Sequence, residues 1–123
     1  MDRMVKFLEI PTRDFDRAAT FYKAVFDDMN IFVTEMLGYK MGFFRKGEED
    51  MWVALVNGSN YVPSAGGVLV YLNAGSDVQT VLDKVQQHHG TVLTPKMQVN
   101  EDIGYIGIFI DTEGNRIGIH AEQ

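Results

Sequence analysis

The sequence contains no cysteine, and this absence excludes several classes of protein. Without cysteine there is no disulfide framework, zinc–thiolate site, iron–sulfur cluster or thiol nucleophile. Proline is scarce, with 3 among 123 residues. No apolar run approaches the ~20 residues that a membrane-spanning helix needs. The first residues carry charges at Asp2, Arg3 and Lys6 where a signal peptide would be apolar, so we expect a cytoplasmic protein with no membrane partner.

Positive charge is also in short supply. Eleven Lys and Arg residues stand against 17 Asp and Glu residues, which gives a net charge of −6. The adjacent basic pair Arg45-Lys46 is followed by Gly47 and by three acidic residues at 48–50, as in a solvated hairpin tip. A nucleic-acid-binding surface requires clustered positive charge, so we expect no nucleic-acid partner.

The rest of the composition is that of an ordinary globular domain. The chain is 46% hydrophobic, 11% aromatic and 23% charged. A chain of this length buries about two-thirds of the surface that its unfolded form exposes, so it needs no disulfide or structural metal. We therefore expect one domain over residues 1–123.

The first half of the chain predicts a strand, a helix and three further strands. Residues Val5–Ile10 are apolar on alternate and intervening positions, which predicts a strand covered on both faces. Asp14 is a good N-cap, and apolar residues then recur at helical spacing from Phe15 to Phe26. Runs of β-branched and aromatic residues predict three strands at 31–34, 39–44 and 51–56.

The second half repeats this order after a turn-rich linker at about residues 58–66. A strand at Val68–Asn73 precedes a helix capped by Ser76 or Asp77, with Gly90 as its left-handed C-terminal cap. Strands follow at 91–93, 105–110 and 116–120. Aligning Asp14 with Asp77 gives an offset of 63 residues, about half the chain. This repeat indicates two duplicated modules, at about 1–57 and 67–123.

Three segments in this order resemble the vicinal oxygen chelate superfamily: Pro11–Tyr22, Gly67–Asn73 and Asp111–Ile117. The superfamily includes glyoxalase I, the bleomycin-resistance proteins, fosfomycin-resistance transferases and extradiol dioxygenases. The resemblance implies an α+β fold of two βαβββ modules, with eight strands and two main helices on the outer faces. It also implies a ligand cavity between modules and a homodimer, in which modules pair within one chain or across two.

Enzymes of this superfamily hold a divalent metal in that cavity, with ligands on the first and last strands of a module. Carried over to this sequence, the ligand positions fall on Phe7, Val68 and Gly118. None of these side chains has a lone pair to donate to a metal. We therefore expect no metal at the usual site, and no other cofactor.

Two polar residues share strand faces with these positions. Glu9 lies two residues after Phe7, and His120 lies two residues after Gly118, so each pair points to one side of its strand. Glu9 has apolar neighbours, so its carboxylate must be paired, protonated or exposed to a wet cavity. We expect Glu9 and His120 to meet in one cavity, directly or through one water. Alternatively, they form a buried structural pair, or His120 is frayed and solvated near the C-terminus.

The same cavity is expected to have an apolar lining. Gly118 leaves room above the sheet for a substrate group, and Phe7 makes that spot apolar. Trp52 is expected to supply an aromatic wall, together with Tyr39, Phe43 or Phe44. The alternative is that these aromatic side chains belong to the hydrophobic core.

Two functions of different classes follow, and the sequence leaves open whether the protein is an enzyme. The first is a small-molecule-binding protein without the usual metal, which holds an apolar or aromatic ligand between modules. The second is a lyase or isomerase resembling glyoxalases, with Glu9 and His120 as an acid/base pair or as replacement metal ligands. An accessory domain with an empty cavity is a third possibility.

Overall fold

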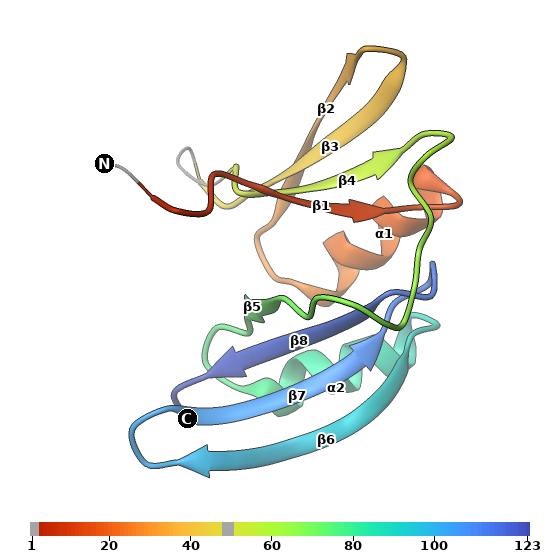
Figure 1. Ribbon diagram of the computed structural model, residues 1–123. Helices are drawn as coiled ribbons and strands as arrows, with labels where there is room; N and C mark the ends of the chain where they lie inside the picture. The colour runs from red at the N-terminus through yellow and green to blue at the C-terminus, as the bar shows by residue number, and fades with distance from the viewer. Residues whose placement is uncertain (1–2, 48–50) are drawn as a thin grey trace.

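The computed structural model describes residues 3–47 and 51–123. The three acidic residues 48–50 of the predicted hairpin tip therefore lie outside the described residues. Within the described residues the chain forms two helices and eight strands (Figure 1). In chain order the elements are β1 (Leu8–Pro11), α1 (Phe15–Val25), β2 (Asn30–Met36), β3 (Tyr39–Arg45), β4 (Val53–Asn57), β5 (Tyr71–Asn73), α2 (Val78–Gln87), β6 (Thr91–Asn100), β7 (Gly104–Ile110) and β8 (Arg116–Ala121).

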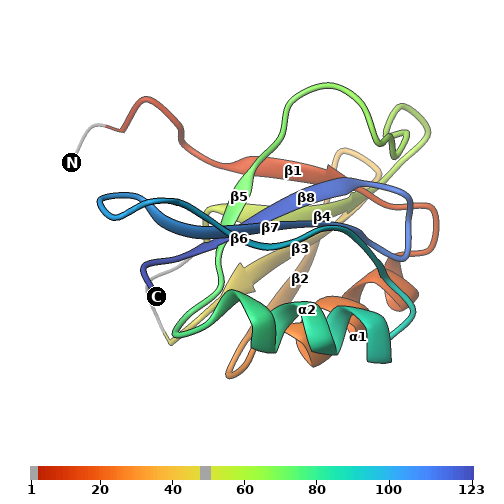
Figure 2. The same ribbon diagram turned by 90° about the horizontal axis from the view of Figure 1, so that it is seen from below.

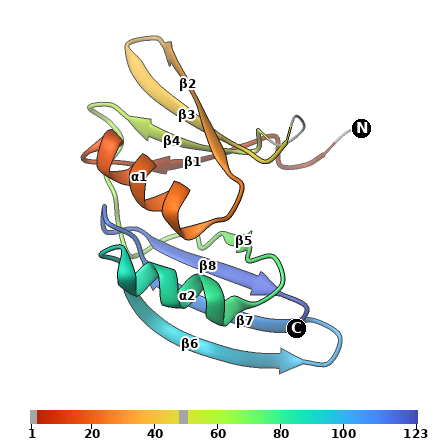
Figure 3. The ribbon, with the colours of Figure 1, turned by 180° about the vertical axis from the view of Figure 1, so that it is seen from behind.

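The strands form two four-stranded sheets with the same topology, β1-β4-β3-β2 and β5-β8-β7-β6. In each sheet the first strand pairs in parallel with the last strand of its module, and the other pairings are antiparallel. The predicted fold of two βαβββ modules is therefore confirmed. Both helices lie side by side on the same side of the sheets (Figures 2 and 3). We call the opposite side of each sheet its open face.

Local sequence explains where the helices begin. Asp14 caps α1, because its carboxylate accepts a hydrogen bond from the Arg17 backbone N–H at 3.1 Å. Asp77 caps α2 through the Gln79 N–H at 2.9 Å, which selects Asp77 over Ser76 as the cap. Helix α1 ends at Val25, one residue before the predicted end.

The end of α2 differs from the prediction. His89, not Gly90, adopts the left-handed conformation, with φ of 77°. Gly90 is required for a different reason, since a Cβ there would lie 2.7 Å from a Val85 methyl carbon and 2.9 Å from the Phe21 ring. The predicted role of Gly90 is therefore wrong, and its small size instead lets the chain pass close to both helices.

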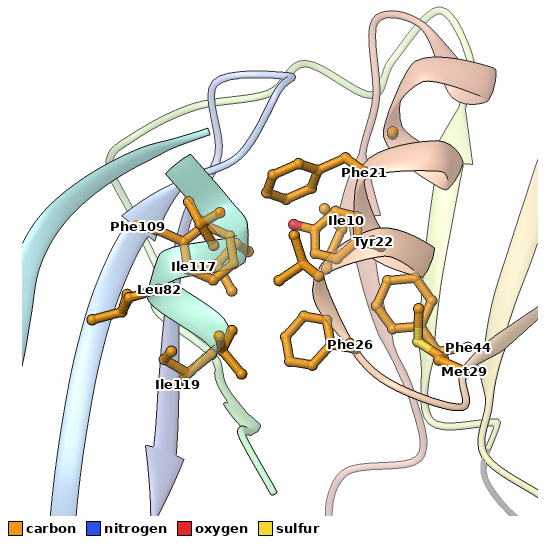
Figure 4. Packing of buried hydrophobic residues seen from close by; sticks show 14 of the residues in the cluster. Ile10, Phe21, Tyr22, Phe26, Met29, Phe44, Leu82, Phe109, Ile117 and Ile119 are labelled. Atoms are coloured by element: carbon orange, nitrogen blue, oxygen red, sulfur yellow. The ribbon is translucent and has the colours of Figure 1, made fainter. Parts of the chain in front are cut away.

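One hydrophobic core joins the two modules on the helical side (Figure 4). Aromatic side chains of α1 (Phe21 and Tyr22) and of the residue that follows it (Phe26) lie opposite residues of the second module. The second module contributes Leu82, Phe109, Ile117 and Ile119 to the same cluster. A separate, smaller cluster of Met41, Ala54 and Val56 lies on the open face of the first sheet. The main core thus lies on the helical side, whereas the open face of the first sheet holds only the smaller cluster.

The extent of three strands differs from the sequence-based prediction. Strands β1 and β5 begin at Leu8 and Tyr71, three residues later than predicted, and β6 continues to Asn100. Pro95 lies inside β6, which an edge strand tolerates because one side of its backbone needs no ladder hydrogen bonds. The prediction that both faces of the first strand are buried is wrong for a single chain, since Phe7 is 49% exposed.

A polar cluster ties the last turn of module 2 to the start of α1. The buried Glu113 carboxylate accepts hydrogen bonds from the backbone N–H groups of Arg13 at 2.8 Å and Asp14 at 2.7 Å, and from Arg17 Nε at 2.8 Å. Asp111 accepts a 2.6 Å hydrogen bond from the buried Tyr22 hydroxyl. The two modules are therefore held together by buried polar contacts as well as by the shared core.

Burial and ion pairing act in opposite directions on Glu113. Burial opposes its ionisation, but the Arg17 guanidinium and the backbone N–H groups of Asp14 and Arg13 together hold the pKa of Glu113 below its ordinary value. Burial, reinforced by Asp111, raises the pKa of the Tyr22 hydroxyl. Glu113 is thus ionised and Tyr22 is protonated at neutral pH.

Candidate functional site

Strand alternation places one carboxylate among aromatic rings on the open face of the first sheet. Glu9 on β1 pairs with Ala54 on β4, which pairs with Phe43 on β3. Phe43 packs against the open-face cluster, and Phe7 meets it edge to face with ring centroids 6.0 Å apart. Tyr39, two positions from Met41 on β3, packs on the same cluster. Of the expected aromatic walls, Phe43 and Tyr39 lie on this face, whereas Phe44 lies in the core.

Tyr61 completes this arrangement from the linker between the modules. Its hydroxyl lies 3.0 Å and 3.1 Å from the two carboxylate oxygens of Glu9 and donates a hydrogen bond to them. Its ring contacts Tyr39 edge to face at 5.2 Å. The hydrogen bond to Glu9, helped by partial burial, raises the pKa of the Tyr61 hydroxyl. One hydroxyl proton leaves most of the acceptor capacity of the carboxylate unused.

Sequence reasoning missed Tyr61, because it lies in a turn-rich segment without periodicity. The only signal was an aromatic residue followed by Val62 and Pro63 in a stretch of small polar residues. We define the aromatic face as Phe7, Glu9, Tyr39, Phe43 and Tyr61.

Trp52 lies at a different place. It precedes β4, and the Arg3 guanidinium stacks over its ring at 3.5 Å from the centroid. Its side chain lines a cavity of about 140 Å³ with Phe26, Phe44 and Leu72. Glu9 instead lines a cavity of about 220 Å³ at the seam between the modules. The structure therefore separates Trp52 from the cavity that Glu9 reaches.

His120 lies on β8 and is held by a backbone contact. Its Nε2 donates to the carbonyl of Ile103, which fixes the proton on that nitrogen and leaves Nδ1 available. The side chain lines a cavity of about 510 Å³ together with Tyr71, Asn73 and Glu122. His120 is thus anchored in the sheet, in contrast to the frayed alternative.

The structure does not bring Glu9 and His120 together within one chain. They belong to different sheets, line different cavities and have different hydrogen-bond partners. The physical reason is that both helices pack on one side of the two sheets, so the open faces of one chain do not face each other (Figure 2). The expected shared cavity is therefore not formed by a single chain.

The space expected above Gly118 is occupied. A Cβ at this position would lie 2.6 Å from the ring of Tyr71, which pairs with Gly118 in the sheet. Gly118 thus accommodates the tyrosine ring and does not leave an open gap for a substrate. The prediction of an empty space at Gly118 is wrong for this reason.

Val68 is also displaced from its expected position. Thr12 and Ala74 donate equivalent backbone hydrogen bonds to the last strands of their modules, at an offset of 62 residues. The caps Asp14 and Asp77 differ by 63, because the second connection is one residue longer. Leu69 is therefore the equivalent of Phe7, and Val68 is 93% exposed ahead of β5.

The side chains at the carried-over positions do not fit a divalent metal. Phe7, Val68 and Gly118 offer no ligand atom, and Tyr71 is the side chain nearest to Gly118. Within residues 3–47 and 51–123, no three His, Asp or Glu side chains gather in a way that could hold a metal ion.

The profile of the Glyoxalase/Bleomycin resistance protein/Dioxygenase superfamily matches residues 4–119. The chain therefore belongs to this superfamily. No curated protein matches the sequence.

Solved structures show the same fold at low sequence identity. The hypothetical protein SA1046 from S. aureus is 22% identical over 98% of this chain and 97% of its own, with a TM-score of 0.68. The fosfomycin resistance protein FosX from Listeria monocytogenes is 15% identical over 100% and 94%, with a TM-score of 0.71. A glyoxylase/bleomycin resistance protein/dioxygenase domain from Frankia sp. EAN1pec is 13% identical over 100% of both chains, with a TM-score of 0.73.

Neither helix is a candidate for crossing a membrane. Across the part of the chain that the structure describes, no helix combines the required length with sufficient apolar character.

Proposed function

We propose that this protein binds an apolar or aromatic small molecule on the aromatic face, without the divalent metal typical of its superfamily. The observation that carries the proposal is the geometry around Glu9, an exposed carboxylate that accepts a hydrogen bond from the Tyr61 hydroxyl and shares the open face of the first sheet with the partly buried rings of Phe43 and Tyr39. Ligand sites commonly combine apolar and aromatic walls with a few polar groups that fix orientation. Phe7 places an aromatic ring where enzymes of the superfamily carry a metal ligand, and this ring favours contact with an apolar group of the bound molecule.

We propose further that the protein is a homodimer, and that the second copy closes the site. The open faces expose Phe7, Phe32, Tyr71 and Met97 to between 45% and 49% of their full extent. An apolar sheet face normally packs against another layer, and the helices already cover the other side. In a two-fold arrangement, the aromatic face of one protomer lies against the open face of its partner's second sheet, β5-β8-β7-β6. Glu9 of one protomer then shares a cavity with His120 of its partner.

The experiment is a titration with benzyl alcohol, an uncharged aromatic probe, followed by amide shifts in NMR spectra. We expect saturable shifts at residues of the aromatic face, and about tenfold weaker binding by F43A because the central ring is lost. Val33→Ala is the matched control, since Val33 is an exposed β2 residue that points to the helical side. Shifts confined to residues outside the aromatic face would contradict the proposal.

A second candidate function is a lyase or isomerase reaction. Its support is chemical: Glu9 keeps acceptor capacity for a substrate proton, and His120 keeps an available Nδ1. Meeting across the dimer, the two groups would form an acid/base pair. Turnover of the methylglyoxal–glutathione hemithioacetal, lost in E9Q with dimerisation intact, would favour this candidate over binding alone. The cytoplasmic location expected from the sequence stays a prediction.

A further inference from the structure

Glu9 carries a charge that the described chain does not neutralise. Four ion pairs form within residues 3–47 and 51–123, and they join Arg17 to Glu113, Lys40 to Asp16, Lys84 to Asp27 and Lys96 to Asp77. Arg116 lines the same seam cavity as Glu9, but it forms no ion pair with Glu9 within 4.0 Å. The only hydrogen-bond donor to this carboxylate among the described residues is the neutral Tyr61 hydroxyl.

The rings around Glu9 likewise lack a cation from the chain. Aromatic rings present a negative face that attracts ammonium and guanidinium groups. Elsewhere, cations of the chain already cover such rings: Arg3 over Trp52 at 3.5 Å, and Lys40 over Phe15 and Lys96 over Tyr105, each at 4.7 Å. In the described part of the chain, no Lys or Arg lies over a ring of the aromatic face.

A carboxylate and several aromatic rings thus lie on the same open sheet face, and both features favour positive charge. Closing this surface with a second protomer removes water from Glu9, and a desolvated carboxylate requires a counter-charge. The net charge of −6 adds a general attraction for cations and a repulsion of anions.

From this combination, we infer that the ligand of the aromatic face is an organic cation: a primary or quaternary ammonium group attached to an aromatic or apolar skeleton. The inference rests on the proposed function and names the ligand class of the same site. Glu9 is the counter-ion, Tyr61 orients its carboxylate, and the rings of Phe43, Tyr39 and Phe7 contact the alkyl groups and the skeleton.

The test compares three probes of similar size on the full chain by isothermal titration calorimetry at low salt: benzyltrimethylammonium, benzyl alcohol and benzoate. We expect benzyltrimethylammonium to bind at least tenfold more tightly than benzyl alcohol, and benzoate to bind most weakly. E9Q should weaken the binding of the cation about tenfold and that of benzyl alcohol much less, because the glutamine keeps a hydrogen-bonding oxygen but loses the negative charge. An unfolding midpoint equal to that of wild type shows that the variant is folded. E35Q is the matched control, because Glu35 is an exposed carboxylate on the helical side of the same sheet.

The outcomes separate this inference from the proposed function. Equal binding of all three probes at the aromatic face, or a cation affinity that E9Q does not change, would overturn the inference while the site itself stands. Binding of none of the probes would overturn both. A loss of cation binding in E35Q equal to that in E9Q would also count against the inference, because it would reflect overall charge.

Discussion

Glu113 illustrates how a single buried side chain connects the modules. Its carboxylate is fully buried, and it receives two backbone N–H groups at the start of α1 as well as the Arg17 guanidinium. A carboxylate near a helix N-terminus is favoured by the unpaired N–H groups there. Glu113 therefore complements the Asp14 cap from the other module.

Replacing Glu113 by Gln should destabilise the fold by about 2–3 kcal/mol, because a charge-assisted buried interaction is lost while Arg17 keeps its charge. Part of the Arg17 interaction is screened, since that side chain is half exposed. Urea unfolding measures the change. The control E101Q alters an exposed turn carboxylate and should have almost no effect. A similar stability for E113Q and wild type would contradict the role assigned to Glu113.

The same carboxylate predicts a pH dependence. Its pKa in the folded state lies below the ordinary value of 4.5, so its contribution to stability is complete above that pH and is lost as the pH falls through the folded-state pKa. We expect the stability difference between wild type and E113Q to be constant from pH 6 to 8 and to shrink below about pH 4.5. Unfolding curves at several pH values test this, and a difference that grows on acidification would contradict it.

At the residue scale, the sequence indicated that Glu9 is unusual but not what it contacts. A carboxylate inside an apolar strand is recognisable from its neighbours alone. Its partner Tyr61 is 52 residues away in an irregular segment, and such a contact depends on how the linker crosses the sheet. The same limitation applies to Gly118, since the ring that fills its space belongs to another strand.

At the scale of elements, the end of α2 combines two requirements in adjacent residues. His89 takes the left-handed conformation that favours glycine, while Gly90 must be small for packing. His89 thus adopts a backbone conformation that costs conformational free energy for a residue with a side chain, at the position where a helix commonly ends in glycine.

H89G should therefore stabilise the protein by about 0.5–1 kcal/mol, because glycine adopts positive φ without a steric cost, although its greater freedom when unfolded reduces the gain. The matched change H88G should be destabilising, since His88 has a negative φ of −114°. Denaturant midpoints at an unchanged m-value measure both effects. A lower midpoint for H89G than for wild type would contradict the conformational argument.

Helices were easier to predict than strand ends for a physical reason. The apolar face of α1 repeats along the sequence and follows an Asp cap, so the predicted start at about Phe15 is confirmed. The extent of β6 depends on pairing with β7, which includes register shifts and tolerates Pro95 at the sheet edge. Such pairing is a long-range property that local residue patterns do not contain.

At the scale of the whole molecule, the proposed dimer predicts a defined response to substitution. M97D should shift the protein toward a monomer of 13.9 kDa, because it places a charge on the open face that the partner covers. Q86D is the control, since Gln86 is exposed on α2 on the helical side. Sedimentation equilibrium at micromolar concentration distinguishes the two states. A wild-type protein that sediments as a 13.9 kDa monomer would contradict the dimer.

The contact between Arg17 and Glu113 also orders events during synthesis. The two residues are 96 positions apart, so the ribosome completes all of module 1 and most of module 2 before the partner of Arg17 exists. Until then, the backbone N–H groups of Arg13 and Asp14, just before the first turn of α1, lack their acceptor, and α1 lacks the core residues that the second module supplies. Nascent module 1 therefore exposes apolar surface, as incomplete domains commonly do during translation. The two modules therefore depend on each other, because the contacts that complete the start of α1 come from the last turn of module 2.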